Sequence, residues 1–370
     1  MKASVSIGSA PYLPNPHKLV AMRLGSRLLI LVVALGVVVP IVVLFSSLDT
    51  GLGKIRGTQP SNTAATRGAM QESTVQDPQG RAGSSRLISP MWWTNHIHST
   101  CERLGYQKPR VEEIKPEMFK KILVDDDNKL LYCQIPKVAS TTWRRVFLLL
   151  SGKMNTTNPL ELRSNDVHHK YDEFLTYLSD FSTSDIMYRL NHYFKFVFVR
   201  EPFERLLSAF RNKFETNTLS AAYFRKQFGR KIIEKYRENP TKEAVELGTD
   251  LKFEEFVNYL TDPKRKLHLN EHWDKFQDLC HPCIVNYDFI GKLPNIDKDS
   301  GYVLERTGIA DKVKFPSRSE SKYGRLGTDS YMKKYYTQIP KKSLIQLFNM
   351  YKADFAIFNF TIPEVIKEML

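Results

Sequence analysis

The sequence predicts an α/β fold, in which a central parallel sheet has helices on both faces and an amino-terminal transmembrane helix comes first. Three observations predict it. Strand-like and helix-like patterns alternate from Leu130 to Phe214, and again from Ile284 to about Gly308, as in parallel α/β proteins. The chain of 370 residues is 42% hydrophobic, which is enough for a large core. An uncharged apolar run covers Leu28 to Phe45.

The charge of the chain favours a negatively charged partner. Lys and Arg number 54 and Asp and Glu 40, so the net charge is +14. Nucleic acid, an anionic glycan, a phosphate-bearing cofactor and a membrane surface all suit that charge. With only 4 Cys and 18 Gly, the chain is neither a disulfide-dense miniprotein nor a collagen.

The apolar run predicts a signal-anchor over residues 28–46. At about 1.5 Å per residue it is roughly 27 Å long, near the thickness of a bilayer core. Basic residues dominate the preceding segment, so residues 1–27 form a cytosolic tail and the rest is lumenal or extracellular. A cleaved signal peptide is the rival interpretation, but the run is long and no small-x-small site follows it cleanly.

Beyond the anchor, residues 47–114 are predicted to form a flexible lumenal stem. Residues 51–85 hold much Gly, Ser, Thr, Gln and Pro, and such a segment cannot bury enough apolar surface to order itself. The folded domain is expected over residues 115–370. Two sequons within it, at Asn155 and Asn359, are glycosylation acceptors if the domain is lumenal.

All four cysteines follow the apolar run and are expected to form two structural disulfides. Three pairings are possible. The pair Cys280 and Cys283 also has the CxxC spacing of a redox motif or of half a zinc site. No second CxxC exists, and Cys101 and Cys133 lack the spacing of metal ligands. No metal site is expected.

A first strand–loop–helix unit has the character of a phosphate site. A strand is predicted over Lys129–Ile135 and a helix over Trp143–Leu150. A helix amino terminus at a strand end presents free N–H groups to an anion. Lys137 adds a positive charge there, and the Ser and Thr hydroxyls can cap the helix. The glycines of a Walker loop are absent. The loop consists of Pro136, Lys137, Val138, Ala139, Ser140, Thr141 and Thr142.

A second unit follows the same plan. A strand is predicted over Tyr193–Val199, Arg200 stands at its end, and a helix covers Phe203–Phe214. Arg200 and the hydroxyl of Ser208 can hold a second phosphate by charge-assisted hydrogen bonds. The alternative is that Arg200 only forms an ion pair with Glu201 or Glu204.

The two motifs, PKVASTTWRR and FVFVREPFERLLSAFRNKF, resemble the Golgi carbohydrate sulfotransferases, in particular the chondroitin/dermatan N-acetylgalactosamine 4-O-sulfotransferases. The resemblance extends to FEEFVNYL (253–260), NEHWDKFQDLCHPC (270–283), YDFIGK (287–292) and YKADFAIFNFTIP (351–363), and covers about residues 115–370. Ser140 stands where the family has Cys, Thr142 where it has Asn and Arg144 where it has Lys. The pair Val138-Ala139 favours the chondroitin/dermatan branch over a branch acting on terminal sugars.

The resemblance implies a P-loop-like sulfotransferase fold and transfer of a sulfuryl group from 3′-phosphoadenylyl sulfate to a glycan hydroxyl, in a type II membrane protein of the Golgi. The loop 136–142 would then hold the 5′-phosphosulfate, with Lys137 on the leaving oxygen. The 3′-phosphate would bind at the second motif. That segment consists of Arg200, Glu201, Pro202, Phe203, Glu204, Arg205, Leu206, Leu207 and Ser208.

The proton of the acceptor hydroxyl needs a base. His168 is the first candidate and His272 the second, with Glu271 next. Asn270, Glu271 and Trp273 are expected to hold a sugar by hydrogen bonds and stacking. The basic run Lys264-Arg265-Lys266 would contact a polyanionic glycan, or would simply form a solvated loop.

Three other classes compete with this interpretation. A nucleotide kinase would need the Walker loop that is absent. A catalytically silent, membrane-anchored glycan-binding protein would have less reason to keep Lys137, Arg200 and Ser208. Nucleic-acid binding would explain the charge, but a lumenal domain would not meet nucleic acid. Sulfation of terminal sugars on glycoproteins or glycolipids is the remaining alternative for the acceptor.

Overall fold

The computed structural model describes residues 90–320 and 329–370. The expected cytosolic tail, the apolar run and residues 47–89 of the expected stem lie outside the described residues. In the part that is described, no helix is both long and apolar enough to cross a membrane.

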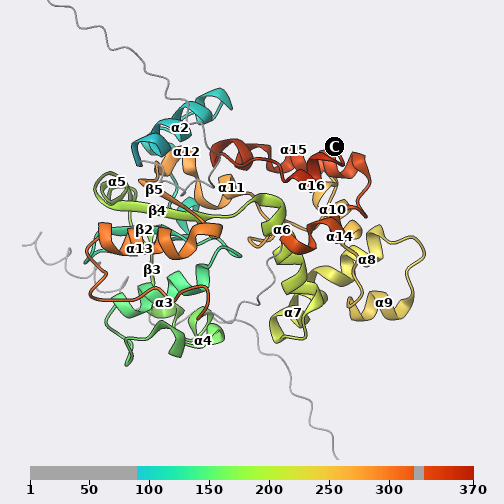
Figure 1. The fold of residues 1–370 in the computed structure, drawn as a ribbon, viewed down its shortest axis with the longest axis horizontal. Coiled ribbons are helices and arrows are strands. Elements are labelled where there is room, and N and C mark those ends of the chain that lie inside the picture. Colours follow the sequence, from blue (N-terminus) through green and yellow to red (C-terminus); the bar gives the residue numbers. More distant parts are fainter. Residues whose placement is uncertain (1–89, 321–328) are drawn as a thin grey trace, which may run out of the picture. The chain divides into compact units, whose positions relative to one another are not determined.

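The central sheet has five strands in the order β3-β1-β2-β4-β5 (Figure 1). Strands β2, β4 and β5 are parallel to one another, whereas β1 is antiparallel to both β2 and β3. The expected all-parallel sheet is therefore corrected to a mixed one. The reason is the short turn between β1 and β2, because only an antiparallel pair can be joined so tightly. The strands are β1 (Ile122–Asp125), β2 (Leu130–Cys133), β3 (Thr176–Tyr177), β4 (Phe194–Val199) and β5 (Phe289–Lys292).

The two strands predicted to be parallel neighbours are confirmed. Leu130 is opposite Phe194 and Cys133 is opposite Val197. Strand β2 is buried along its whole length and β4 along nearly all of its length, as expected of parallel strands that are covered on both faces. Their carboxyl ends lie at the same edge of the sheet, so the two segments that follow them start close together.

Helices flank the sheet and also form a separate helical region. In Figure 1, α3 and α4 lie below the strands and α2 and α12 above them. A π-helical turn, Arg211–Glu215, continues α6. The helices are α2 (Pro90–Arg103), α3 (Ser140–Leu150), α4 (Ser164–His168), α5 (Thr183–His192), α6 (Pro202–Phe210), α7 (Leu219–Phe224), α8 (Arg230–Tyr236), α9 (Lys242–Leu247), α10 (Phe253–Thr261), α11 (Phe276–Cys280), α12 (Pro282–Val285), α13 (Ile296–Arg306), α14 (Asp329–Tyr336), α15 (Lys341–Ile357) and α16 (Glu364–Lys367).

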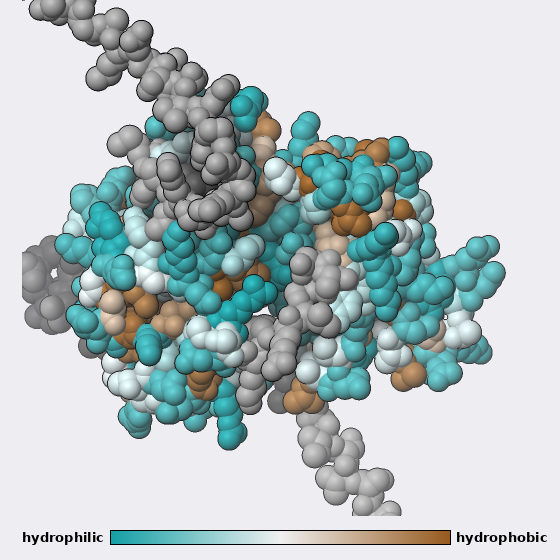
Figure 2. All heavy atoms as spheres, in the orientation of Figure 1, coloured by the Kyte–Doolittle hydropathy of each residue, from teal (hydrophilic) through white to brown (hydrophobic). Residues whose placement is uncertain are grey.

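Two hydrophobic cores divide the described residues. The first surrounds the sheet and includes residues of α2, α3 and α13. The second is built almost wholly from helices, from α6 to α10 and from α14 to α16. Strand β4 belongs to the first core and α6 to the second, so the turn between them joins the cores. Figure 2 shows that the visible surface is largely hydrophilic with small apolar areas, some of them over α15 and α16.

Two disulfides confirm the structural interpretation of the cysteines and fix their pairing. Cys101 bonds to Cys283 and Cys133 to Cys280, with Cα–Cα distances of 5.7 and 5.9 Å. The two cysteines of the CxxC sequence thus have different partners and do not form a redox pair. Within residues 90–320 and 329–370, no cluster of His, Cys, Asp or Glu could hold a metal ion.

Helix α2 changes the expected boundary between the stem and the domain. Trp93 and Ile97 are buried in the first core, and the disulfide at Cys101 ties the helix to α12. Residues 90–103 therefore belong to the folded unit, although the sequence places them in the stem. The predicted stem is too long because the composition of residues 51–85 does not continue to residue 114. Aromatic residues return before that point.

Candidate active site

The loop after β2 has an unusual backbone. Lys137 and Ala139 have φ angles of 74° and 62°, a region that costs non-glycine residues of order 1–3 kcal/mol and is frequent at functional sites. Ala139 is the N-cap of α3 and makes no side-chain capping bond. The expected capping by the Ser and Thr hydroxyls is therefore wrong. Among the described residues, no acceptor meets the backbone N–H groups of Ser140 and Thr141, which stay available to an anion.

Lys137 lies in a cluster of positive charges. Burial, the main cause, and then the charges of Lys213, Arg200 and Arg205 together lower its pKa to about 7. The parallel strands β2 and β4 end at the same edge of the sheet, and the charge of Arg200 acts on Lys137 there. Cations held so near one another favour a polyanionic ligand, which would raise their pKa values again.

The end of β4 differs from the end of β2 in its cap. The Glu201 carboxylate accepts hydrogen bonds from the backbone N–H groups of Phe203 at 3.1 Å and Glu204 at 2.7 Å. It therefore occupies the amino terminus of α6. Arg200 is only 8% exposed, and its Nε donates to Glu204 Oε2 at 3.2 Å. Ser208 is half-buried one turn beyond Glu204 on the same helix face.

Several residues of the predicted cofactor segments have side chains that face a core. They support the two turns and do not present a side chain to a ligand. Thr142 is also buried, at 5% exposure. The buried apolar members are Val138 in the first core and Phe203, Leu206 and Leu207 in the second, together with Pro202.

Arg205 links the loop after β2 to a distant turn. Its Nε donates to the carbonyl oxygen of Pro136 at 3.2 Å. Its Nη2 donates to the carbonyl of Glu271 at 2.7 Å, and Nη1 to that of Asp274 at 2.6 Å. The guanidinium is 2% exposed and stacks on Phe276. Arg205 is therefore a structural clamp and not a side chain that faces the cofactor.

His168 reaches the start of α3. Its Nε2 lies 2.9 Å from the hydroxyl oxygen of Thr141. Although the residue is exposed, desolvation by the surrounding protein and then the charge of Arg144 lower its pKa to about 4. Arg144 also donates to the carbonyl oxygen of Val167 at 2.9 Å, which fixes the residue before His168.

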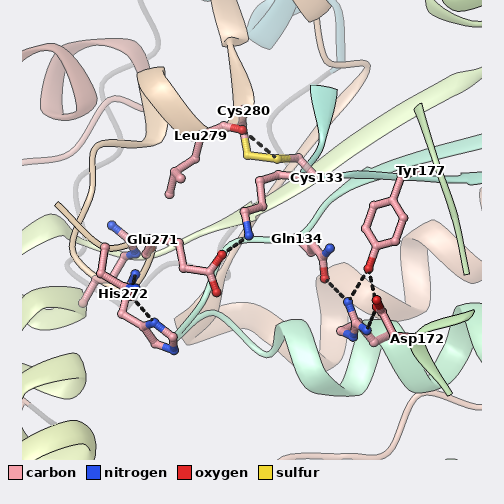
Figure 3. A network of polar contacts seen from close by, with 12 residues as sticks. Cys133, Gln134, Asp172, Tyr177, Glu271, His272, Leu279 and Cys280 are labelled. Carbon is pink, nitrogen blue, oxygen red and sulfur yellow. Dashed lines mark hydrogen bonds and ion pairs between the residues drawn. A yellow bond between two sulfur atoms is a disulfide. The ribbon is translucent and has the colours of Figure 1, made fainter. Parts of the chain in front are cut away.

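A polar network surrounds the segment after β2. Gln134 accepts from Arg144 Nη1 at 2.8 Å. Figure 3 shows Asp172 and Tyr177 on one side of Gln134, and Glu271 and His272 on the other. Because these groups come from elements far apart in the sequence, the end of β2 is held from two directions.

His272 is more enclosed than His168. Its Nδ1 lies 2.6 Å from Asn270 Oδ1. Burial, the main cause, and then the positive charges of Lys213 and Lys137 lower its pKa well below 6.5. The charge of Lys137 acts on His272, so the two residues lie in the same part of the fold.

The expected sugar platform beside His272 is wrong in part. Trp273 is 0% exposed and lies in the second core, so its indole cannot stack on a sugar. The Glu271 carboxylate forms an ion pair with Lys121. Burial, the main cause, and neighbouring positive charges lower the pKa of that lysine to about 8.

Sequence reasoning missed Lys213 as a site residue. Its ammonium is 9% exposed, donates to Ser220 Oγ at 2.9 Å and lies 4.5 Å from the centroid of the Phe224 ring. None of the described ion pairs includes it, and burial lowers its pKa to about 8. The signal was present in the FRNKF segment, where a single Lys stands between aromatic residues.

A strained strand–helix loop and buried cations beside the ends of two parallel strands are the features of a site that binds a phosphorylated ligand. Comparison with known proteins identifies the family of this protein. A family model described as the sulfotransferase family matches residues 120–361, and the chain belongs to this family. The resemblance found in the motifs is confirmed. Membership implies 3′-phosphoadenylyl sulfate as the sulfuryl donor.

The curated relatives are carbohydrate sulfotransferases. Carbohydrate sulfotransferase 11 of Mus musculus is 39% identical over 275 residues, which cover 74% of this chain and 76% of that protein. The Danio rerio protein of the same name is 37% identical over 304 residues, covering 82% and 84%. Carbohydrate sulfotransferase 14 of Danio rerio is 40% identical over 253 residues, covering 68% and 65%. No solved structure gives a significant match. The chain is thus an enzyme of the carbohydrate sulfotransferase class.

Proposed function

We propose that this enzyme transfers a sulfuryl group from 3′-phosphoadenylyl sulfate to the 4-hydroxyl of N-acetylgalactosamine in chondroitin or dermatan. The observation that carries the proposal is that the parallel strands β2 and β4 end beside each other, with the charges of Lys213 and Arg200 acting on Lys137 there. The Val138-Ala139 pair supports the choice of acceptor over terminal sugars. A lumenal Golgi location, with the apolar run as a type II anchor, is part of the proposal.

In the proposed reaction, the 5′-phosphosulfate lies against the start of α3. The N–H groups of Ser140 and Thr141 bind its oxygens, and Lys137 neutralises the leaving phosphate oxygen. The S–O bond to that oxygen breaks, and its electron pair stays on the phosphate. The acceptor hydroxyl oxygen forms the new S–O bond, and its proton goes to His168 or His272. The products are 3′,5′-adenosine bisphosphate and the sulfate ester.

The proposed 3′-phosphate site uses Arg200 and Ser208. The present ion pair of Arg200 with Glu204 matches the structural alternative for this arginine, but it does not exclude ligand binding. A phosphate accepts two charge-assisted bonds from a guanidinium and holds it better than one carboxylate contact. Arg200 would therefore turn from Glu204 towards the ligand. Ser208 stands one helical turn further along that face.

Two surface features support a lumenal enzyme with a long acidic acceptor. The sequon residues Asn155 and Asn359 are both exposed, as glycosylation requires. Lys264 and Lys266 are exposed too and would contact a polyanionic chain. Arg265 differs, because its Nη1 donates to the carbonyl oxygens of Leu260 and Asp262 at the end of α10.

The test is sulfuryl transfer from labelled donor to a panel of desulfated chondroitin, desulfated dermatan and oligosaccharides ending in N-acetylgalactosamine. The full chain is expected to label chondroitin or dermatan, with the label at the 4-position after lyase digestion. Lys226→Ala is the control for the loss of a lysine charge, because Lys226 is exposed. Label only on terminal sugars would replace the proposed acceptor. Binding of 3′,5′-adenosine bisphosphate without transfer to any glycan would favour the silent glycan-binding protein.

A further inference from the structure

We infer that Asn270 is a positioning residue that holds His272 with its Nε2 lone pair free, so that His272 and not His168 takes the proton of the acceptor hydroxyl. This inference rests on the proposed function. It concerns a segment that lies outside both cofactor motifs. It depends on which atom of the Asn270 amide faces the imidazole, and on whether that atom accepts or donates a hydrogen bond.

The Asn270 side chain fixes the tautomer of the ring. Its Oδ1 accepts a hydrogen bond from the backbone N–H of His272 at 3.1 Å. That contact assigns the atom as the oxygen, because an amide NH₂ group would face a second donor there. An amide oxygen has no proton to give, so Nδ1 of the ring, 2.6 Å away, must be the donor. A neutral imidazole with a proton on Nδ1 has none on Nε2, which is then a proton acceptor.

The surroundings keep this imidazole neutral. The ring packs edge-on against Phe224 at a centroid distance of 5.1 Å. Burial, the main cause, and the surrounding positive charges together lower its pKa well below 6.5. The negative charge of a bound donor raises the basicity of the ring again when it is needed. The charged groups that act on it are Lys213, Lys137, Arg205 and Lys121.

A single guanidinium sets the position of His272 relative to Lys137. Arg205 donates to the carbonyl of Pro136, directly before Lys137, and to the carbonyl of Glu271, directly before His272. The lysine assigned to the leaving oxygen and the imidazole are thus each one residue from the same clamp. A sulfuryl group between them would have Lys137 on its leaving side and Nε2 on its acceptor side.

His168 has a different arrangement. Its Nε2 already shares a hydrogen bond with the Thr141 hydroxyl, and a hydroxyl can donate or accept, so no tautomer is fixed. Thr141 belongs to the first turn of α3, where the donor phosphosulfate is proposed to bind. His168 therefore supports the donor loop, while His272 has the free lone pair.

The experiment measures kcat, the KM for the donor and kcat/KM for the acceptor against pH in the full chain. The variants are Asn270→Asp, Asn270→Ala, His272→Gln and His168→Gln. His272→Gln is expected to lose about 10²–10⁴-fold in kcat, the range for general base catalysis. Asn270→Asp keeps an acceptor oxygen and adds a negative charge, so it should stay active while the acidic limb of its profile moves to higher pH. Asn270→Ala should lose at least about tenfold in kcat, because the tautomer is no longer fixed.

Calorimetric binding of 3′,5′-adenosine bisphosphate reports whether each variant is folded, and all four are expected to bind it. His168→Gln should mainly raise the KM for the donor. The inference is overturned if His272→Gln stays within a few-fold of the parent, if His168→Gln loses more kcat than His272→Gln, or if Asn270→Asp leaves the acidic limb in place. A parent that binds the bisphosphate but sulfates no glycan would overturn the proposed function, and the base assignment with it. An active parent with unaffected variants would overturn the base assignment alone.

Discussion

The ends of β2 and β4 are neighbours in one sheet, and each leads into a helix, yet the two helix amino termini differ. At α3 the N-cap is Ala139, without a side-chain bond, and the preceding backbone is strained. At α6 the Glu201 carboxylate already accepts two backbone N–H groups. The first terminus can bind an anion through its backbone, whereas the N–H groups of the second are already bonded to the Glu201 side chain.

This difference shows that one sequence pattern can serve two kinds of anion site. At the β2 end, backbone groups and Lys137 can surround a phosphosulfate. At the β4 end, only side chains remain for a phosphate, namely Arg200 and Ser208. The proposed division of the donor follows: the reacting group lies at the strained, open loop, and the anchoring phosphate lies at the capped, regular helix. Each prediction below tests one side of this comparison.

Among changes at the two strand ends, the largest effect is expected at Lys137. Lys137→Ala should lower kcat by about 10²–10³-fold, because one fixed donor to the developing charge on the leaving oxygen is lost. Initial rates at saturating donor and acceptor measure it, and the melting temperature checks that the protein is folded. Activity within a few-fold of the parent would remove Lys137 from the mechanism.

Arg200→Ala should act mainly on donor binding. Loss of a charge-assisted hydrogen bond costs about 1.5–3 kcal/mol, so the KM for the donor should rise by roughly 10–100-fold. Part of that binding energy is used in the transition state, so a smaller fall in kcat is expected as well. Lys226→Ala, which removes an exposed charge from the helical region, is the control. A donor KM equal to that of the parent would leave Arg200 with its ion pair to Glu204 as its role.

The pH dependence of ligand affinity should differ between the β2 end and the β4 end. Burial lowers the pKa of Lys137 to about 7, so the free protein loses this charge as the pH rises from 7 to 9. A bound 5′-phosphate favours the protonated lysine, and its affinity should therefore fall by at least about tenfold over that range. Arg200 stays charged, so the affinity for 3′-AMP should change little. Calorimetry at pH 7, 8 and 9 makes the comparison, and equal slopes for 5′-AMP and 3′-AMP would contradict it.

The smallest effect concerns the cap of α6. Glu201→Ala should destabilise the fold by about 0.5–2 kcal/mol, as the loss of an N-cap does, with donor affinity unchanged. Burial raises the pKa of Glu201 from 4.5 to about 8. A raised carboxyl pKa means that its contribution to stability is full below about pH 4.5 and is lost as the pH rises through 8. Glu201→Gln should remove this dependence from the melting temperature. Weaker donor binding in Glu201→Gln would show that the carboxylate contributes to the ligand site.

The elements that could be predicted from the sequence are those with local signals. The buried strands β2 and β4 are continuous apolar runs, and parallel pairing follows from the helix between them. The antiparallel β1 was missed because a four-residue strand with a tight turn carries little pattern. Helix α2 was missed because it packs on, and is disulfide-bonded to, segments far along the chain, and spacing does not specify that pairing.

The candidate site was likewise predictable only where the sequence carries a local signal. Lys137 and Arg200 stand at strand ends, where the sequence can place them. The clamp by Arg205 and the enclosure of Lys213 join segments that are far apart in the chain, and no local pattern indicates such contacts. The burial of Trp273 shows the reverse error, because an aromatic residue beside polar ones was expected at the surface but packs in a core.

The most direct test of the division between the two strand ends is a binding cycle with truncated ligands. Calorimetry of 3′-AMP and 5′-AMP with the parent, Lys137→Ala and Arg200→Ala gives six affinities. If the β2 end holds the 5′-phosphate and the β4 end the 3′-phosphate, Lys137→Ala weakens only 5′-AMP and Arg200→Ala weakens only 3′-AMP. If both variants weaken the same ligand, or each weakens both equally, the two ends do not divide the donor and the account is wrong.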